Sequence, residues 1–201
     1  MTYLEKVLRD DPALISEEYG VARYKDVNAN VISICQRHAM HQALSSTLKE
    51  YFNYEPIKGL VIGGPIHEFP ADESTRLNVV RENSDIWPYD GSRIPAADNY
   101  FHVVNTCHSM EHLADPKTTV NEVLRVLKIG GLFVNVVPDR MFHRHDMSNH
   151  KVGDRCYHEW TPEECFDLLF KNYIRHGAFR LLQFNTRQNK LDFDIILRKL
   201  K

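Results

Sequence analysis

A helical stripe followed at once by a buried strand is the feature that most constrains the fold of this chain. From Thr118 to Leu127 apolar residues recur at the helical period, and Gly130-Gly131 follows as a helix stop. Leu132 to Val137 is then an almost continuous apolar run, broken only by Asn135 and closed by Pro138. Such a run is typical of a strand covered on both faces. This order predicts a parallel sheet flanked by helices.

The same alternation continues along the chain. The apolar run from Lys58 to the glycines at 63 and 64 predicts a buried strand, and further strands are expected near 77–80, 102–105, 179–184 and 193–197. The last two are close enough to form an antiparallel hairpin. Helices are expected over about 30–54, ending at Pro56, and from Thr161, where Thr161-Pro162-Glu163-Glu164 has the pattern of a capping box. Residues 1–20 suggest one or two short helices. We expect an N-terminal helical extension over 1–55 and an α/β domain over 56–201.

Composition narrows the classes of function. The 201 residues include 43% hydrophobic and 26% charged side chains, as in an ordinary globular protein. A net charge of −2 and a pI of about 6.6 give no basic signature of a nucleic-acid-binding protein. No apolar run reaches about 18 residues, so no membrane span is expected. The N-terminus lacks an apolar signal core, and the four cysteines form no C-x-x-C pair. Both features favour a cytoplasmic protein with reduced thiols.

Ligands of an open α/β sheet bind outside the carboxyl ends of its strands. This rule directs attention to the residues that directly follow the predicted strands. They are Gly63 and Gly64, Arg81 to Asn83, Asn105 to His108, and Val137 to Arg140, and we add Asp90 to Ser92, which lies between two predicted strands.

Short motifs follow one another in order between Asp90 and Pro138. They are Asp90-Gly91, Ile94-Pro95, Asp98-Asn99-Tyr100-Phe101, Glu111-His112, Asp115-Pro116 and Arg125-Val126-Leu127-Lys128-Ile129-Gly130-Gly131. In type and spacing they resemble the middle of a class I S-adenosylmethionine-dependent methyltransferase. The similarity is to the methyltransferase type 11 family and the quinone-biosynthesis methyltransferases.

The resemblance implies a Rossmann-like, doubly wound, seven-stranded and mostly parallel sheet with an antiparallel last strand, and S-adenosylmethionine as the cofactor. Carried over residue by residue, it places Gly63 and Gly64 at the amino-acid end of the cofactor and Glu82 at the ribose hydroxyls. It places Asp90 and Gly91 beside the adenine. Asn105 and Thr106 would lie beside the cofactor and the transferred methyl group.

One motif of that family is reduced here. Its glycine loop usually reads Asp/Glu-x-Gly-x-Gly-x-Gly, whereas this chain has Val61-Ile62-Gly63-Gly64-Pro65. Two glycines remain and the preceding acid is absent. The short distance from Gly64 to Asp90 also means that the usual helix between the first two strands is trimmed or replaced by a loop.

A histidine-rich segment lies between the fourth strand and the Thr161 helix. Its polar side chains are His143, His145, Asp146, His150, Cys156, His158 and Glu159. One interpretation is a lid over the methyl acceptor, with His143 and His145 binding substrate and a histidine serving as general base. A second is a zinc or iron site, although the spacing matches no closed motif and no metal ligand is assigned. A third is a polar surface loop. His108 is a further candidate for substrate contact or for the base.

The leading hypothesis is methyl transfer to a small-molecule acceptor, with no nucleic-acid partner. The rival is a non-catalytic protein of the same fold that regulates or scaffolds a partner, because a fold alone does not establish activity. A third class is a metal-dependent enzyme that uses the histidine segment. The first 55 residues either cover the acceptor pocket or mediate homodimer formation.

Overall fold

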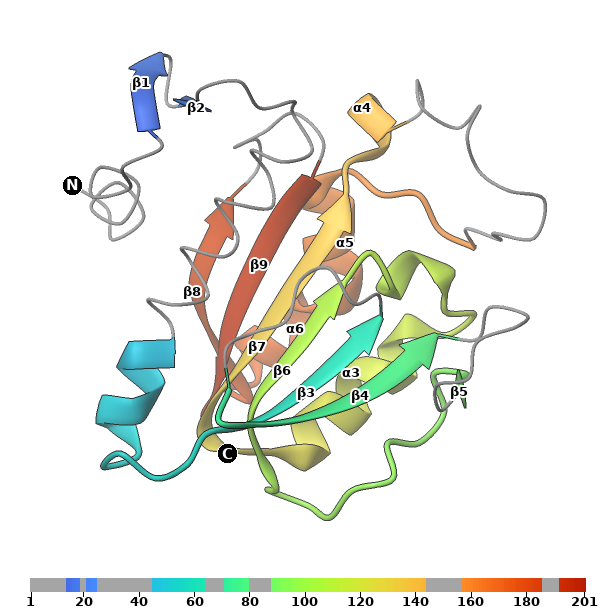
Figure 1. Cartoon of the computed structure of the whole chain (residues 1–201). Coiled ribbons are helices and arrows are strands. Elements are labelled where there is room, and N and C mark those ends of the chain that lie inside the picture. Colours follow the sequence, from blue (N-terminus) through green and yellow to red (C-terminus); the bar gives the residue numbers. More distant parts are fainter. Residues whose placement is uncertain are drawn as a thin grey trace.

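A seven-stranded sheet organises the chain from residue 58 onward (Figure 1). The computed structural model describes residues 14–18, 21–24, 45–63, 71–79, 88–143, 157–185 and 192–201. The strands are β3 (Lys58–Gly63), β4 (Glu73–Val79), β5 (Pro88–Tyr89), β6 (Phe101–Cys107), β7 (Leu127–Pro138), β8 (Phe179–Asn185) and β9 (Asp192–Lys199). The helices are the 3₁₀ turn η2 (Met110–His112), α3 (Pro116–Val126), α4 (Arg140–His143), α5 (Pro162–Leu169) and α6 (Lys171–Arg175).

The strand order is β5-β4-β3-β6-β7-β9-β8. Neighbouring strands from β5 to β7 are parallel, while β9 runs antiparallel to both β7 and β8. The first strand of this sheet, β3, lies in its middle. The strands β4 and β5 follow on one side of β3, and the chain then crosses to the other side, where β6 pairs with β3. This reversal is a topological switch point, where ligands of open α/β sheets bind. The predicted α/β, mostly parallel fold class is confirmed.

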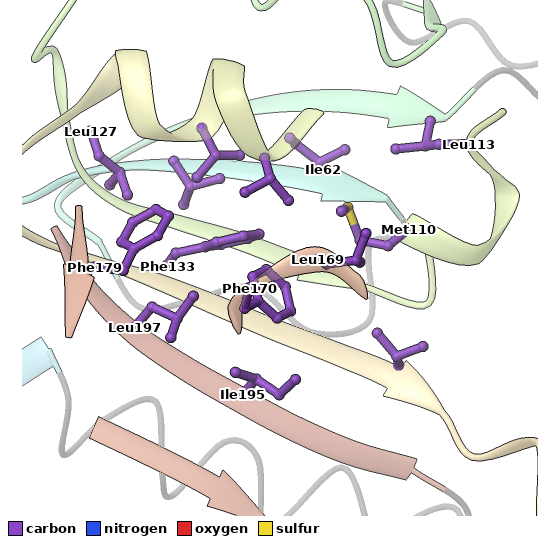
Figure 2. Close-up of a cluster of buried hydrophobic side chains, with 14 of the residues drawn as sticks. Ile62, Met110, Leu113, Leu127, Phe133, Leu169, Phe170, Phe179, Ile195 and Leu197 are labelled. Carbon is purple, nitrogen blue, oxygen red and sulfur yellow. The ribbon is translucent and has the colours of Figure 1, made fainter. Parts of the chain in front are cut away.

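One face of the sheet packs against α3, α5 and α6 (Figure 1). Its core contains the aromatic side chains Phe133, Phe170 and Phe179 (Figure 2). Phe133 and Phe170 meet edge to face, with ring centroids 5.8 Å apart. The predicted helical stripe contributes Val120 and Val123, both fully buried.

The other face contacts a helical segment over residues 45–51. Its Leu48 is fully buried in a cluster with Val103, Leu132 and Val134. The helical segment thus packs directly on the central strands.

Several boundaries differ from the sequence-based expectations. Residues in the predicted N-terminal helices instead form an antiparallel pair, β1 (Leu14–Glu18) and β2 (Val21–Tyr24). The helix expected over 30–54 is described only from residue 45, and it ends before Pro56, at residue 51. Asn53 and Tyr54 follow it with φ values of 52° and 60°, which cannot continue a right-handed helix. The division at residue 55 remains a prediction.

The glycine pair at 130–131 lies inside β7 rather than ahead of it. The pairing with β6 passes from Phe101↔Leu127 to Val103↔Leu132, so residues 128–131 bulge out of the ladder. Gly130 has a φ of 84°, which suits this bulge. Among the described residues, none forms a helix long and apolar enough to cross a membrane.

Candidate functional site

Gly63 ends β3 at the switch point, directly beside the end of β6. Its register partner is Cys107, the last residue of β6. Gly63 has a φ of 115°, and a Cβ here would lie 2.8 Å from Ser109 Cβ and 2.9 Å from the Cys107 carbonyl oxygen. Ser109 Oγ donates a hydrogen bond of 2.8 Å to the Ile62 carbonyl. The fold itself therefore requires glycine at position 63, because the loop after β6 packs against its backbone.

The turn after β5 is built from Asp90 and Gly91. The Asp90 carboxylate accepts hydrogen bonds from the Ser92 amide at 2.8 Å and the Ser92 hydroxyl at 2.6 Å. These bonds hold the pKa of the Asp90 carboxyl below its usual value. Gly91 is buried with a φ of 91°, and its carbonyl accepts from Thr119 Oγ1 at 3.2 Å. The turn is thus shaped by its own side chains and by α3.

Asn105 and Thr106 lie inside the sheet rather than at its edge. Both are fully buried on β6 and are in register with Val61 and Ile62 of β3. Thr106 Oγ1 donates to Asn135 Oδ1 at 2.6 Å. The Thr106 hydroxyl therefore bonds within the sheet, and the predicted contact of these two residues with a cofactor remains a prediction.

His108 directly follows β6 with a φ of 47°, unusual for a residue other than glycine. Its amide donates to the Val136 carbonyl at 3.0 Å, which ties the turn to β7. Its Nε2 atom lies 2.8 Å from Oδ1 of Asp192, a buried residue at the start of β9, while the imidazole is 34% exposed. A buried carboxylate thus orients a partly exposed imidazole at the carboxyl edge of the sheet, an arrangement that suits proton transfer.

Glu111 in η2 is a buried acid beside this histidine. Burial raises the pKa of its carboxyl, and the nearby His108 and His112 offset part of that rise. Its carbonyl accepts the amides of Tyr157 and His158 at 2.9 and 3.1 Å, which ties the end of the histidine-rich segment to η2. Glu111 Oε2 has no hydrogen-bond partner in the described part of the chain. The Glu111-His112 pair is one of the motifs recognised in the sequence, but nothing in the local sequence pattern indicated that the acid is buried.

Several predicted residues lie outside the described residues. These are Gly64, Glu82, His145 and the rest of segment 144–156, whereas His143 ends α4. Within the described ranges, no group of three or more histidine, cysteine, aspartate or glutamate side chains could hold a metal ion. Of the cysteines in those ranges, Cys107 and Cys165 are both buried thiols.

Comparisons with known proteins agree with this geometry. Residues 67–135 match a family model described as a methyltransferase domain, Methyltransf_11. No curated protein sequence matches the chain significantly.

Solved structures with the same fold are numerous, and three illustrate the likeness. The plantazolicin methyltransferase BpumL in complex with SAH is 13% identical, with 86% of this chain and 87% of that chain covered and a TM-score of 0.62. The methyltransferase bound to the Haloferax volcanii activator Trm112 is 15% identical, with 86% and 94% covered and a TM-score of 0.54. An S-adenosylmethionine-dependent methyltransferase from Mesorhizobium loti is 13% identical, with 72% and 91% covered and a TM-score of 0.52.

Sequence identities this low establish the fold alone. The match to the family model concerns residues 67–135 only. The chain therefore has the fold of solved S-adenosylmethionine-dependent methyltransferases, and its residues 67–135 match the model of a methyltransferase domain.

Proposed function

We propose that this protein transfers a methyl group from S-adenosylmethionine to a small-molecule acceptor. The observation that carries the proposal is the switch point of a sheet with the methyltransferase strand order. Gly63, the Asp90-Gly91 turn and His108 all follow strands at this carboxyl edge. The methyltransferase domain match over 67–135 supports the same reaction.

The described residues fit a bound nucleoside at one side of this edge. Gly63 and Gly91 have positive φ, and the place of a Cβ at each faces protein atoms, so a ligand would contact their peptide groups from the other side. The Asp90 carboxylate is already oriented by Ser92 and can accept a further donor. Gly64 and Glu82 complete the proposed cofactor set, at the amino-acid end and the ribose respectively.

The proposed acceptor lies on the other side of this edge, at His108. When bound, S-adenosylmethionine supplies an activated methyl group, so the chain mainly aligns the acceptor and excludes water. The imidazole of His108, oriented by Asp192, receives the proton that a hydroxyl or similar acceptor loses on methylation. His143 and His145 are proposed to contact the acceptor from the connection after β7.

Calorimetry with S-adenosylhomocysteine tests the proposal. A micromolar or tighter dissociation constant is expected for the full chain. An Asp90→Ala variant should bind about 10- to 150-fold more weakly, since a lost hydrogen bond to a charged group costs about 1.5–3 kcal/mol. Asp167→Ala, which removes only the surface ion pair with Lys171, is the matched control and should bind normally. No binding up to millimolar concentration would overturn the proposal and support a regulatory or scaffold protein.

The acceptor side needs a separate experiment. His108→Gln and Asp192→Asn should leave the affinity for S-adenosylhomocysteine unchanged. Both should slow product formation with a protic acceptor, by a factor of about 10²–10⁴ for His108→Gln. Variants that turn over as fast as the natural chain would remove His108 from the proposed site. Light scattering on the purified chain tests the homodimer.

A further inference from the structure

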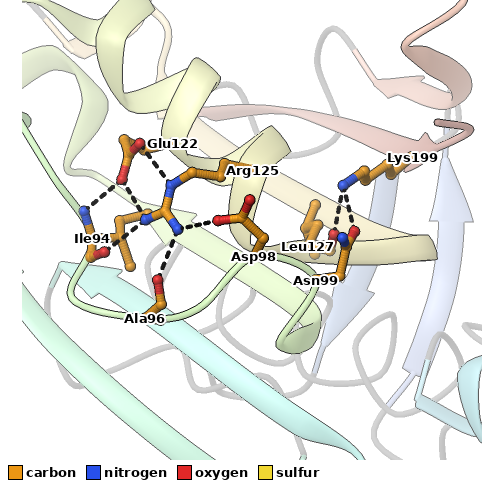
Figure 3. Close-up of polar contacts among 8 residues, drawn as sticks. All are labelled: Ile94, Ala96, Asp98, Asn99, Glu122, Arg125, Leu127 and Lys199. Carbon is orange, nitrogen blue, oxygen red and sulfur yellow. Dashed lines mark hydrogen bonds and ion pairs between the residues drawn. The ribbon is translucent and has the colours of Figure 1, made fainter.

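Three polar side chains on α3 bind the backbone of the segment that follows β5, and Figure 3 shows the contacts of two of them, Glu122 and Arg125. They are Thr119, Glu122 and Arg125, spaced three residues apart and therefore neighbours on the surface of the helix. Between them they contact the segment near its start, in its middle and at its end. This segment begins with the Asp90-Gly91 turn.

Arg125 makes most of these contacts. Its Nη1 atom donates to the Ala96 carbonyl and to Asp98 Oδ1, both at 2.8 Å, and Nη2 donates to the Ile94 carbonyl at 2.8 Å. The remaining N–H groups donate to the Glu122 carboxylate, at 2.9 Å from Nε and 2.7 Å from Nη2. A planar guanidinium satisfies this fixed set of acceptors, which a lysine ammonium could not.

Glu122 holds the other half of the same peptide. Its Oε2 atom accepts the Ile94 amide at 2.9 Å. The Glu122–Arg125 pair therefore binds both the N–H and the C=O of Ile94, whose side chain is buried in the core. The bond to Arg125 keeps the pKa of the Glu122 carboxyl below its usual value, so the pair stays ionised.

Thr119 acts at the start of the segment. Its hydroxyl donates to the Gly91 carbonyl at 3.2 Å and accepts from the Tyr89 hydroxyl at 3.3 Å. One helix thus fixes residues on both sides of the turn. These hydrogen bonds to α3 involve no ligand, and a loop that is held in place in advance loses less entropy on binding.

We infer that Thr119, Glu122 and Arg125 are positioning residues that place the Asp90-Gly91 turn against the adenine of the cofactor. This inference rests on the proposed function. It assigns to α3 a share of both cofactor affinity and base selectivity, although none of the three side chains would touch the cofactor.

The test compares two ligands that differ only in the base. S-adenosylhomocysteine carries adenine, and S-inosylhomocysteine carries hypoxanthine, which has a carbonyl oxygen in place of the amino group of adenine. This change replaces a hydrogen-bond donor by an acceptor on the base that the Asp90-Gly91 turn would contact. The natural chain should prefer the adenine ligand. Arg125→Lys and Thr119→Val should weaken binding of the adenine ligand by about tenfold and shrink the preference, since one misplaced hydrogen bond suffices for such a change. Thr119→Ser keeps the hydroxyl and should restore both values.

Controls separate the possible outcomes. Lys171→Gln, which removes a surface ion pair on α5 and α6, should bind both ligands normally. Circular dichroism identifies variants that fail to fold. If Arg125→Lys does not fold, the comparison of Thr119→Val with Thr119→Ser tests the inference. Variants that fold and keep the natural affinity and preference would overturn this inference alone. A natural chain that binds neither ligand would overturn the proposed function and this inference with it.

Discussion

Gly63 and Gly177 both have positive φ, but they differ in what surrounds the place of a missing side chain. At Gly63 a Cβ would lie 2.8 Å from Ser109 Cβ and 2.9 Å from the Cys107 carbonyl. At Gly177, where φ is 68°, nothing lies within 4 Å. Alanine at 177 therefore introduces backbone strain only, whereas alanine at 63 adds a steric overlap inside the proposed site.

The two substitutions should differ measurably in free energy of unfolding. Left-handed backbone costs a residue with a Cβ about 1–2 kcal/mol. Overpacking a close contact adds about 1–3 kcal/mol. Gly177→Ala should then lose about 1–2 kcal/mol and Gly63→Ala about 2–5 kcal/mol.

Urea denaturation of the ligand-free chain measures both losses. A further variant, Gly63→Ala with Ser109→Gly, removes the side-chain atoms nearest the new Cβ. It should be more stable than the sum of the two single changes predicts, because the atoms in question are in contact. If Gly63→Ala costs no more than Gly177→Ala, the close approach to Ser109 does not explain this glycine, and a ligand becomes the better reason for it.

Three further predictions concern the core and the turns. Burial raises the pKa of the Glu111 carboxyl in the folded chain above its value in the unfolded chain. The folded chain therefore loses stability as the pH rises from the unfolded-state pKa to the folded-state pKa of this carboxyl. In thermal scans, Glu111→Gln should therefore raise Tm relative to the natural chain at about pH 8 and lose this advantage near pH 4. Leu48→Ala should cost about 2–5 kcal/mol by urea denaturation, and a loss near zero would mean that the helix at 45–51 does not contribute to the core. Thr161→Ala should cost about 1 kcal/mol because it removes the capping box of α5, while Thr161→Ser should cost little.

The central strands were largely predictable from the sequence because burial on both faces leaves a continuous apolar run. β3, β6 and β7 show this pattern most clearly, with interior residues that are almost all buried. β5 was not predicted because Pro88–Tyr89 is too short to have a period. α6 was missed because it has no buried residue.

The residues of the candidate site were harder to predict from the sequence than the fold was. Apolar runs located Gly63 and His108 at strand ends, because a strand end can be read from the run before it, whereas Asp90 was found through its resemblance to a family motif. The Asp192 partner of His108 is distant in sequence and was not predicted. Nothing in the sequence indicated that Arg125 binds carbonyls of the segment after β5, as it does in the structure. Side-chain partners separated by many residues leave no periodic signal.

The helix at 45–51 also limits how this fold can be divided or recombined. Tyr51 packs against Gly130 in the bulge of β7, so closely that a Cβ at 130 would overlap the ring. Lys49 forms an ion pair with Asp72 at 2.9 Å, and Arg198 stacks over the Tyr51 ring. A gene fragment that starts at residue 56 would thus encode the large sheet without Tyr51, whose ring packs against the bulge of β7 at Gly130. We expect fusions and domain exchanges to succeed only when the junction lies upstream of residue 45.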